Sequence, residues 1–470
     1  MNWNELLSEE RLRNSGAKKN TGANTDYRTE FERDYHRIVG SAYFRRLQDK
    51  TQVYSLDGND FVRTRLTHSL EVSSFAKSLG KSVGLRLCEM GKIDYSQAVA
   101  ISDILMCAGL IHDIGNPPFG HYGETVIRDW FGEQMWIRSL ITEDMWNDFT
   151  HFEGNAQSLR IVSRLHHLKD DKGMNLTKAL LNTIIKYPIS STQIGKVPKE
   201  KPYKKMGYFQ ADKVVFDDVT SSTGAYDKRY PLMLLLEAAD DIAYCTADIE
   251  DGMKKGYLSF SLMCDLSKGL MVGDIDASEL LCSLKDEAGD KPDREMIAVQ
   301  NFMVIVQSYL IKDVTNNFVD EKNYEKIMNG EFDQDLFEGT GANLLAKKLK
   351  KIAFEYIFQS NDIIKRELAA DTIVRGLLDE FVPAMMQYDA DNSQGIPIKM
   401  SSKKKKLVGM IPEQYLWVYK KEVEQAEKMD IEGTDEQKKA YFKLLAVTDY
   451  ISGMTDHYAR DLFRELRGIY

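Results

Sequence analysis

Apolar residues recur every three or four positions along most of the chain, a spacing that places them on one face of an α-helix. One such face consists of Ile101, Ile104, Leu105, Ala108 and Ile111. A second apolar segment, residues 231–244, carries three acidic residues inside its pattern. Proline is poorly tolerated inside helices and occurs only 10 times in 470 residues. The pattern therefore predicts a mostly α-helical protein.

Breaks in this pattern divide the chain into three parts. Residues 1–26 form a polar arm rich in Asn, Gly and Ser, and residues 27–260 form a helical core. Within the core, residues 189–226 are richer in Lys, Pro, Gly and Val, which favours a long loop or a small β excursion. Residues 261–470 return to the helical pattern, with an exposed connection near 389–406.

Composition narrows the class of protein. Hydrophobic residues make up 43% and charged residues 29%, which excludes a disordered or collagen-like chain. No segment approaches the roughly 20 apolar residues of a membrane span, and the first residues lack a signal-peptide pattern. We therefore expect a soluble, cytoplasmic protein with no membrane partner. The formal charge, 62 − 72 = −10, disfavours a protein whose main role is to coat nucleic acid.

A histidine–aspartate pair lies where a buried helix must end. His112 directly follows the apolar face of residues 101–111, and Asp113 comes next, before Gly115 and two prolines that stop the helix. Two side chains able to bind a metal therefore stand beside a loop that a substrate can reach. Such a dipeptide arises often by chance, so it is weak evidence alone.

Asp240 strengthens the hypothesis of a metal site, because it lies deep in the apolar segment 231–244. A buried carboxylate is costly unless it is paired or binds a metal. Asp240, Tyr244 and Asp248 are four residues apart and share one stripe of that helix. The alternative is an acid pair on a helix surface. With His68 and His112, the carboxylates would form a mixed nitrogen and oxygen site suited to Mn²⁺, Fe²⁺ or Mg²⁺.

The residues around these positions make the sequence similar to the HD-domain phosphohydrolases, and within them to the bacterial deoxyguanosine triphosphate triphosphohydrolases (dGTPases). The matching blocks span almost the whole chain: Arg45–Val53, Val62–His68, Leu110–Glu124, His151–Gln157, Glu237–Tyr244 and Asp449–Asp456. The resemblance implies an HD-domain catalytic core at 27–260, with the insertion near 189–226. It also implies that the helices of 261–470 complete the nucleotide pocket and the subunit contacts.

The resemblance also assigns roles to residues at the centre of the site. The positions that match the family's ligands for one divalent ion, Mg²⁺ or Mn²⁺, are His68, His112, Asp113 and Asp240. His121 and Glu124 match its catalytic dyad. An imidazole titrates near neutral pH, so His121 suits the general acid that a poor alkoxide leaving group needs.

Further positions match substrate contacts of the family. Gln52 and Asp248 match groups that hold the sugar 3′-hydroxyl, and Tyr244 matches the ring that packs on the deoxyribose. The phosphate contacts correspond to Lys186 and Tyr187, and the guanine side corresponds loosely to Phe358 and Glu367. The arginine expected from the C-terminal part has no clear counterpart, and the segment 397–406 is rich in lysine instead.

The implied reaction is the hydrolysis of dGTP to deoxyguanosine and triphosphate, by attack of water at the α-phosphorus. The resemblance further implies a homo-oligomer, a hexamer in the family. Three alternatives stay open: hydrolysis of a wider range of dNTPs, an HD-type phosphohydrolase that also binds single-stranded nucleic acid, and a regulatory protein that only binds nucleotide.

Overall fold

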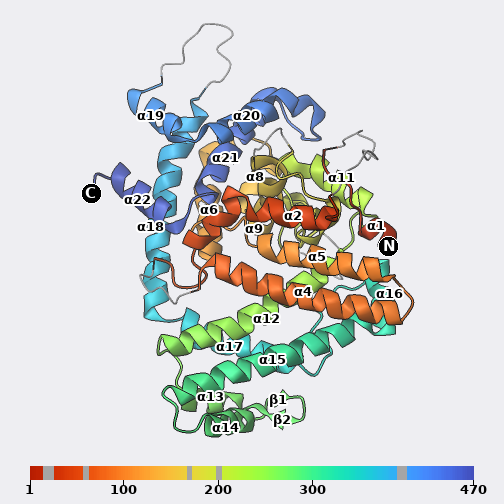
Figure 1. The fold of residues 1–470 in the computed structure, drawn as a ribbon. Helices are drawn as coiled ribbons and strands as arrows, with labels where there is room; N and C mark the ends of the chain where they lie inside the picture. Colours follow the sequence, from red (N-terminus) through yellow and green to blue (C-terminus); the bar gives the residue numbers. More distant parts are fainter. Residues whose placement is uncertain (14–25, 57–62, 167–171, 197–203, 389–399, 470) are drawn as a thin grey trace.

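The computed structural model describes residues 1–13, 26–56, 63–166, 172–196, 204–388 and 400–469, and it confirms a mostly helical protein (Figure 1). Within these residues the only strands are β1 (Met271–Val272) and β2 (Ile275–Asp276), which pair antiparallel with Val272 opposite Ile275. This hairpin lies outside the segment for which a β excursion was predicted.

Three long helices form the centre of the protein: α4 (Arg65–Glu89), α5 (Tyr95–Ile111) and α12 (Pro231–Lys254). Their first turns follow from the local sequence. Capping boxes start α4 at Thr64 and α5 at Asp94, and Pro231 occupies the first turn of α12. Both α5 and α12 pack against α4, as Figure 1 shows.

Gly109 allows α4 and α5 to approach closely near the site. A Cβ atom on Gly109 would lie 2.5 Å from the Cα atom of Ser73, so any larger residue would push the two helices apart. His112 lies one turn after Gly109 on α5, and His68 lies on the facing part of α4. The missing side chain therefore helps to bring the two histidines together.

The remaining helices of the N-terminal half surround this centre. They are α1 (Trp3–Leu6), α2 (Glu30–Val39), α3 (Ala42–Arg46), α6 (Gly120–Glu133), α7 (Met135–Arg138), α8 (Glu143–Thr150), α9 (Gly154–Arg160), α10 (Lys178–Thr183) and α11 (Lys213–Ser222).

One prediction for this half was wrong in part. The segment 189–226 contains helix α11, whose apolar side, including Phe216 and Val219, is buried; residues 197–203 lie outside the described part. The polar arm also begins with a packed helix, because Trp3 is buried and donates a hydrogen bond to the hydroxyl of Tyr324 at 3.0 Å. Trp3 and Leu6 lie among polar residues in the sequence, so the composition of residues 1–26 did not indicate that this helix is buried.

The C-terminal half adds two groups of helices that α18 (Asn361–Met386) connects along one side of the molecule in Figure 1. One group, most of it in the lower part of Figure 1, contains α13 (Phe260–Ser267), α14 (Ala277–Ala288), α15 (Arg294–Val319), α16 (Glu321–Asn329) and α17 (Asn343–Ala353). The upper group contains α19 (Ser402–Met410), α20 (Glu413–Gln425), α21 (Asp435–Ser452) and α22 (Asp456–Leu466). The last residues of the predicted connection 389–406 belong to helix α19, and residues 389–399 lie outside the described part.

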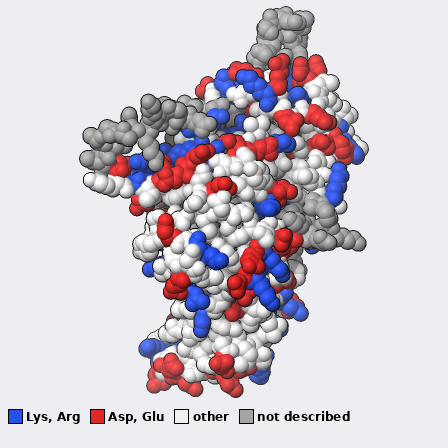
Figure 2. All heavy atoms as spheres, turned by 90° about the vertical axis from the view of Figure 1, so that its right-hand side faces the viewer, with Lys and Arg blue, Asp and Glu red and all other residues white. Residues whose placement is uncertain are grey.

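The surface is consistent with the mixed charge of the sequence. Acidic and basic side chains are interspersed over the face drawn in Figure 2. Among the described residues, no helix combines the length and apolar character that crossing a membrane would require.

Candidate metal and catalytic site

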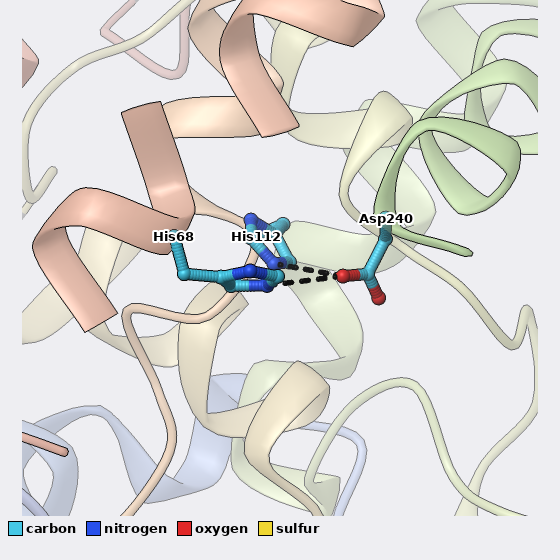
Figure 3. Close-up of side chains that lie close together, drawn as sticks. All are labelled: His68, His112 and Asp240. Carbon is cyan, nitrogen blue, oxygen red and sulfur yellow. Dashed lines mark hydrogen bonds and ion pairs between the residues drawn. The ribbon is translucent and has the colours of Figure 1, made fainter. Parts of the chain in front are cut away.

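His68, His112 and Asp240 converge from the three central helices (Figure 3). The Oδ1 atom of Asp240 lies 3.2 Å from His68 Nε2 and 3.5 Å from His112 Nε2. One ligand atom from each residue lies within 4.8 Å of the others, a spacing that a single ion can bridge. Three of the four predicted metal ligands are therefore together.

The surroundings of His112 support a metal at this position. Its Nδ1 atom lies 2.8 Å from the carbonyl oxygen of Gly109, which only accepts hydrogen bonds, so Nδ1 carries the hydrogen. The buried Nε2 atom faces Asp240 and has no hydrogen-bond partner among the described residues. Burial lowers the pKa of His112, but the carboxylates of Asp113 and Asp240 outweigh it and raise the pKa to about 9, so this nitrogen favours a bound cation, either a proton or a metal ion. A histidine that binds a metal is usually held in this way by its other nitrogen.

Asp113 lies at the edge of this group. Its Oδ1 atom is 3.6 Å from His112 Nε2, while its Oδ2 atom accepts a hydrogen bond from the buried guanidinium of Arg65. Burial raises the pKa of Asp113, but His112 and Arg65 outweigh it and lower the pKa to about 2. The Asp113 carboxylate therefore has one oxygen close to His112 and the other bound by Arg65.

The predicted dyad forms on the first turn of α6. His121 Nδ1 lies 3.1 Å from Glu124 Oε2, and Glu124 Oε1 accepts a hydrogen bond from the backbone N–H of Gly154 at 2.9 Å. The imidazole is 75% exposed and faces a pocket, whereas the carboxylate is 1% exposed. The hydrogen bond that His121 donates to the Glu124 carboxylate raises the pKa of His121, so the imidazole holds its proton to higher pH.

One pocket collects most of the predicted residues. Its wall includes Gln52, His68, Asp113, His121, Asp240, Tyr244, Phe358 and Glu367. His112 and Glu124 lie directly behind this wall through their contacts with Asp240 and His121. Residues from Gln52 to Ala370, 318 positions apart in the sequence, thus line the same pocket.

Inside the pocket, Tyr244 stacks on Phe358 with the ring centroids 5.9 Å apart and the planes 14° apart. The buried Oε1 atom of Gln52 has no hydrogen-bond partner among the described residues, so it is free to accept one from a ligand. Apolar rings beside a buried acceptor suit a ligand with both a flat apolar part and a hydroxyl group.

Three predicted substrate contacts do not line this pocket. Lys186 pairs with Glu237 at 3.2 Å; burial lowers the pKa of Lys186, but this carboxylate outweighs it and raises the pKa. Tyr187, the next residue, lies outside the pocket wall as well. Asp248 is buried on α12, where burial raises its pKa, and its Oδ2 atom has no hydrogen-bond partner among the described residues.

The pocket also contains residues that the sequence analysis missed. Arg65 lies one turn before His68 on α4, a position that its place in the matching block could have suggested. Arg366 lies next to Glu367 on α18 and donates a hydrogen bond to the carbonyl of Ser55. An arginine from the C-terminal half therefore does reach the pocket, although the sequence showed no clear counterpart.

Comparisons with known proteins agree with this geometry. The model of the HD domain family matches residues 65–186, the segment that holds His68, His112 and the dyad. A deoxyguanosinetriphosphate triphosphohydrolase-like protein from Listeria innocua is 42% identical over the full length of both chains. A protein of the same description from Synechocystis is 35% identical over the full length of both.

A third relative, from Serratia proteamaculans, is described as a deoxyguanosinetriphosphate triphosphohydrolase and is 31% identical over 93% of each chain. Identity of this level over nearly the whole length leaves no doubt about common descent. The chain belongs to the dGTPase family of HD-domain hydrolases.

Proposed function

We propose that the protein hydrolyses dGTP to deoxyguanosine and triphosphate, with water attacking the α-phosphorus. The observation that carries this proposal is the single pocket in which the group of His68, His112 and Asp240 lies beside the His121–Glu124 dyad. The Serratia relative, whose name states this activity, supports the choice of substrate.

The proposal includes one Mg²⁺ or Mn²⁺ ion held by His68, His112, Asp240 and Asp113. Two nitrogens and carboxylate oxygens are ligands that such ions accept, and the negative charge of the acids attracts a cation. When bound, the ion would polarise a phosphate oxygen and lower the pKa of the attacking water. Arg65 would keep Asp113 ionised and oriented, because its guanidinium donates to that carboxylate.

His121 is proposed as the general acid that protonates the departing 5′-oxygen of the nucleoside. Its exposed imidazole faces the pocket, and its partner Glu124 stabilises the protonated form. Lys186 and Tyr187 are proposed to bind the outer phosphates. Because Lys186 pairs with Glu237, a phosphate must compete with that carboxylate for the ammonium group.

A panel of substrates tests the reaction. The four dNTPs and GTP would each be incubated with Mg²⁺ or Mn²⁺, and the products would be separated by ion-exchange chromatography. We expect dGTP to give triphosphate and deoxyguanosine, with ¹⁸O from labelled water in the triphosphate. Primary release of dGDP with phosphate, or of dGMP with pyrophosphate, would contradict the proposal. Equal turnover of all four dNTPs would instead favour the broader specificity.

Tyr244 is expected to select deoxyribose over ribose. If its ring packs on the 2′-carbon while Gln52 and Asp248 hold the 3′-hydroxyl, a ribose 2′-hydroxyl would be crowded and stranded, at a cost of about 1–3 kcal/mol. We therefore expect kcat/KM for dGTP to exceed that for GTP by at least about 10-fold. Tyr244→Ala should narrow this ratio, whereas Tyr244→Phe, which keeps the ring, should preserve it. An unchanged ratio in Tyr244→Ala would assign sugar selection to other residues.

The proposal also covers the assembly and location of the protein. We infer a cytoplasmic homo-oligomer in which the region 261–470 contributes subunit contacts and the core 27–260 carries the chemistry. Light scattering tests the assembly, since the mass in solution should be a multiple of 53.8 kDa. Addition of single-stranded DNA to the hydrolysis assay tests whether nucleic acid competes for the site.

A further inference from the structure

The segment Asp449–Asp456, which joins α21 to α22, reaches the back of the pocket from the end of the chain. Both of its acids are 1% exposed. The proposed chemistry gives this segment no role, although it forms one of the matching sequence blocks. Asp456 contacts two loops that carry pocket residues, whereas Asp449 pairs with the buried Arg160 of α9 at 2.8 Å. None of the segment's own residues lines the pocket wall.

Asp456 accepts hydrogen bonds from two separate loops. Its Oδ2 atom accepts from the backbone N–H of Thr51 at 3.0 Å and from the Thr51 hydroxyl. Its Oδ1 atom accepts from the backbone N–H of Phe119 at 2.9 Å. Three donors therefore meet the two oxygens of one buried side chain, and each oxygen accepts at least one hydrogen bond.

Both loops lead directly into the candidate site. Thr51 precedes Gln52, and Phe119 is the N-cap of α6, two residues before His121. Phe119 adopts the left-handed conformation, with φ at 64°, which is unfavourable for a bulky residue. Such a conformation persists only where its surroundings hold it, and Asp456 supplies a hydrogen bond at this residue.

Two further contacts attach the same segment to the site. Lys50 Nζ donates to the carbonyl of Ser452 at 2.9 Å and to that of Asn116 at 2.5 Å. Asp449 accepts from Gln157 Nε2 at 2.9 Å, and α9, which carries Gln157, begins with the backbone N–H that binds Glu124. The segment thus supports both ends of the dyad.

From this geometry we infer that Asp456 is a positioning residue, which holds the turn before α6 so that His121 faces the reacting phosphate. The inference rests on the proposed function. Asp456 acts through the Phe119 backbone and not through contact with substrate, since it lies behind the pocket wall. The C-terminal helices therefore contribute to the chemical step as well as to the pocket.

The test is the variant Asp456→Asn in the full-length protein with Mg²⁺ or Mn²⁺. The asparagine side chain has one acceptor oxygen, whereas the aspartate has two. Its NH₂ group would face one of the backbone N–H donors of Thr51 and Phe119, so the contact with at least one of the two loops must be lost. We expect kcat to fall about 10- to 100-fold, the scale expected for a small misplacement of a catalytic group. The high-pH limb of the kcat profile should move to lower pH, because a loosened first turn weakens the contact of His121 with Glu124. The other charged groups near His121, Arg65 and Asp113, are unchanged.

Asp461→Asn is the matched control on the same helix, because Asp461 is half exposed and pairs only with its neighbour Arg460 among the described residues. It should leave kcat and the pH profile unchanged. A lower kcat in Asp456→Asn with an unchanged pH profile would mean fewer folded molecules and would overturn the inference. If Asp456→Asn does not fold, Asp456→Glu decides, since it keeps the charge but moves the carboxylate relative to the Phe119 N–H; an unchanged kcat and pH profile there would also overturn the inference.

Amide hydrogen exchange separates this inference from the proposed function. The Phe119 amide should exchange faster in Asp456→Asn than in the wild type or Asp461→Asn, whether or not a nucleotide is hydrolysed. Unchanged protection of Phe119 overturns the positioning role. Absence of triphosphate release by the wild-type protein, with faster exchange in the variant, overturns the proposed function while the contact itself stands.

Discussion

Replacing Asp240 with alanine is expected to remove both the bound metal and the turnover. Asp240 is the one carboxylate that lies within 3.5 Å of both His68 Nε2 and His112 Nε2 among the described residues. Loss of groups that only support a ligand costs 10- to 100-fold, so loss of this ligand should lower turnover by more than about 100-fold. Metal per chain after gel filtration, measured by mass spectrometry, and release of triphosphate would check both effects.

Asp241 provides a matched control one residue away. Its carboxylate pairs with Lys350 at 2.7 Å and does not belong to the converging group. Asp241→Ala should therefore retain the metal and most of the turnover. The opposite pattern, with metal lost in Asp241→Ala and retained in Asp240→Ala, would show that the proposed ligand is the wrong member of the pair.

His121→Ala is expected to lower turnover by roughly 10²- to 10⁴-fold, the usual contribution of a general acid or base. The metal should remain, because His121 is not part of the group formed by His68, His112 and Asp240. Single-turnover measurements with the metal content determined in parallel would check this result. Turnover within a few fold of the wild type would reduce His121 to a structural residue of the loop.

The pH dependence gives a second measure of the dyad. The hydrogen bond and charge of Glu124 raise the pKa of His121, so turnover that needs the imidazolium is present at low pH and is lost as the pH rises through that pKa. Glu124→Gln removes the charge, and the pKa of His121 should fall towards its ordinary value. The high-pH limb of the kcat profile should then move to lower pH, and an unmoved limb would contradict the role of Glu124.

The periodic pattern predicted the helices that carry the site, because their buried faces require regular spacing. The apolar face of residues 101–111 lies on α5, and His112 is its C-cap, as the following glycine and prolines suggested. Asp240, in the middle of α12, was predicted to be a functional residue because a buried carboxylate needs a charged partner or a metal. The resemblance of long blocks then supplied the dyad and the pocket residues Gln52 and Tyr244, and a looser match supplied Phe358.

Other features were not accessible from local pattern. Helix α11 lies in a segment whose flanking lysines, glycines and prolines dominated the composition. Asp113 was predicted as a metal ligand only, yet it also binds Arg65, and a shared carboxylate cannot be recognised from spacing. Lys186 has an ion-pair partner in Glu237, a contact 51 positions away in the sequence that only folding creates.

The sequence by itself determined the helical class, the family and the residue types of the site, because these depend on periodicity and on chemistry carried by single side chains. Only the tertiary structure decided which of these side chains meet. It brought Arg366 of α18 to the pocket and placed Asp456 between Thr51 and Phe119, across 405 and 337 positions of sequence. Such contacts follow from the packing of helices distant in the sequence, which leaves no regular spacing along the chain.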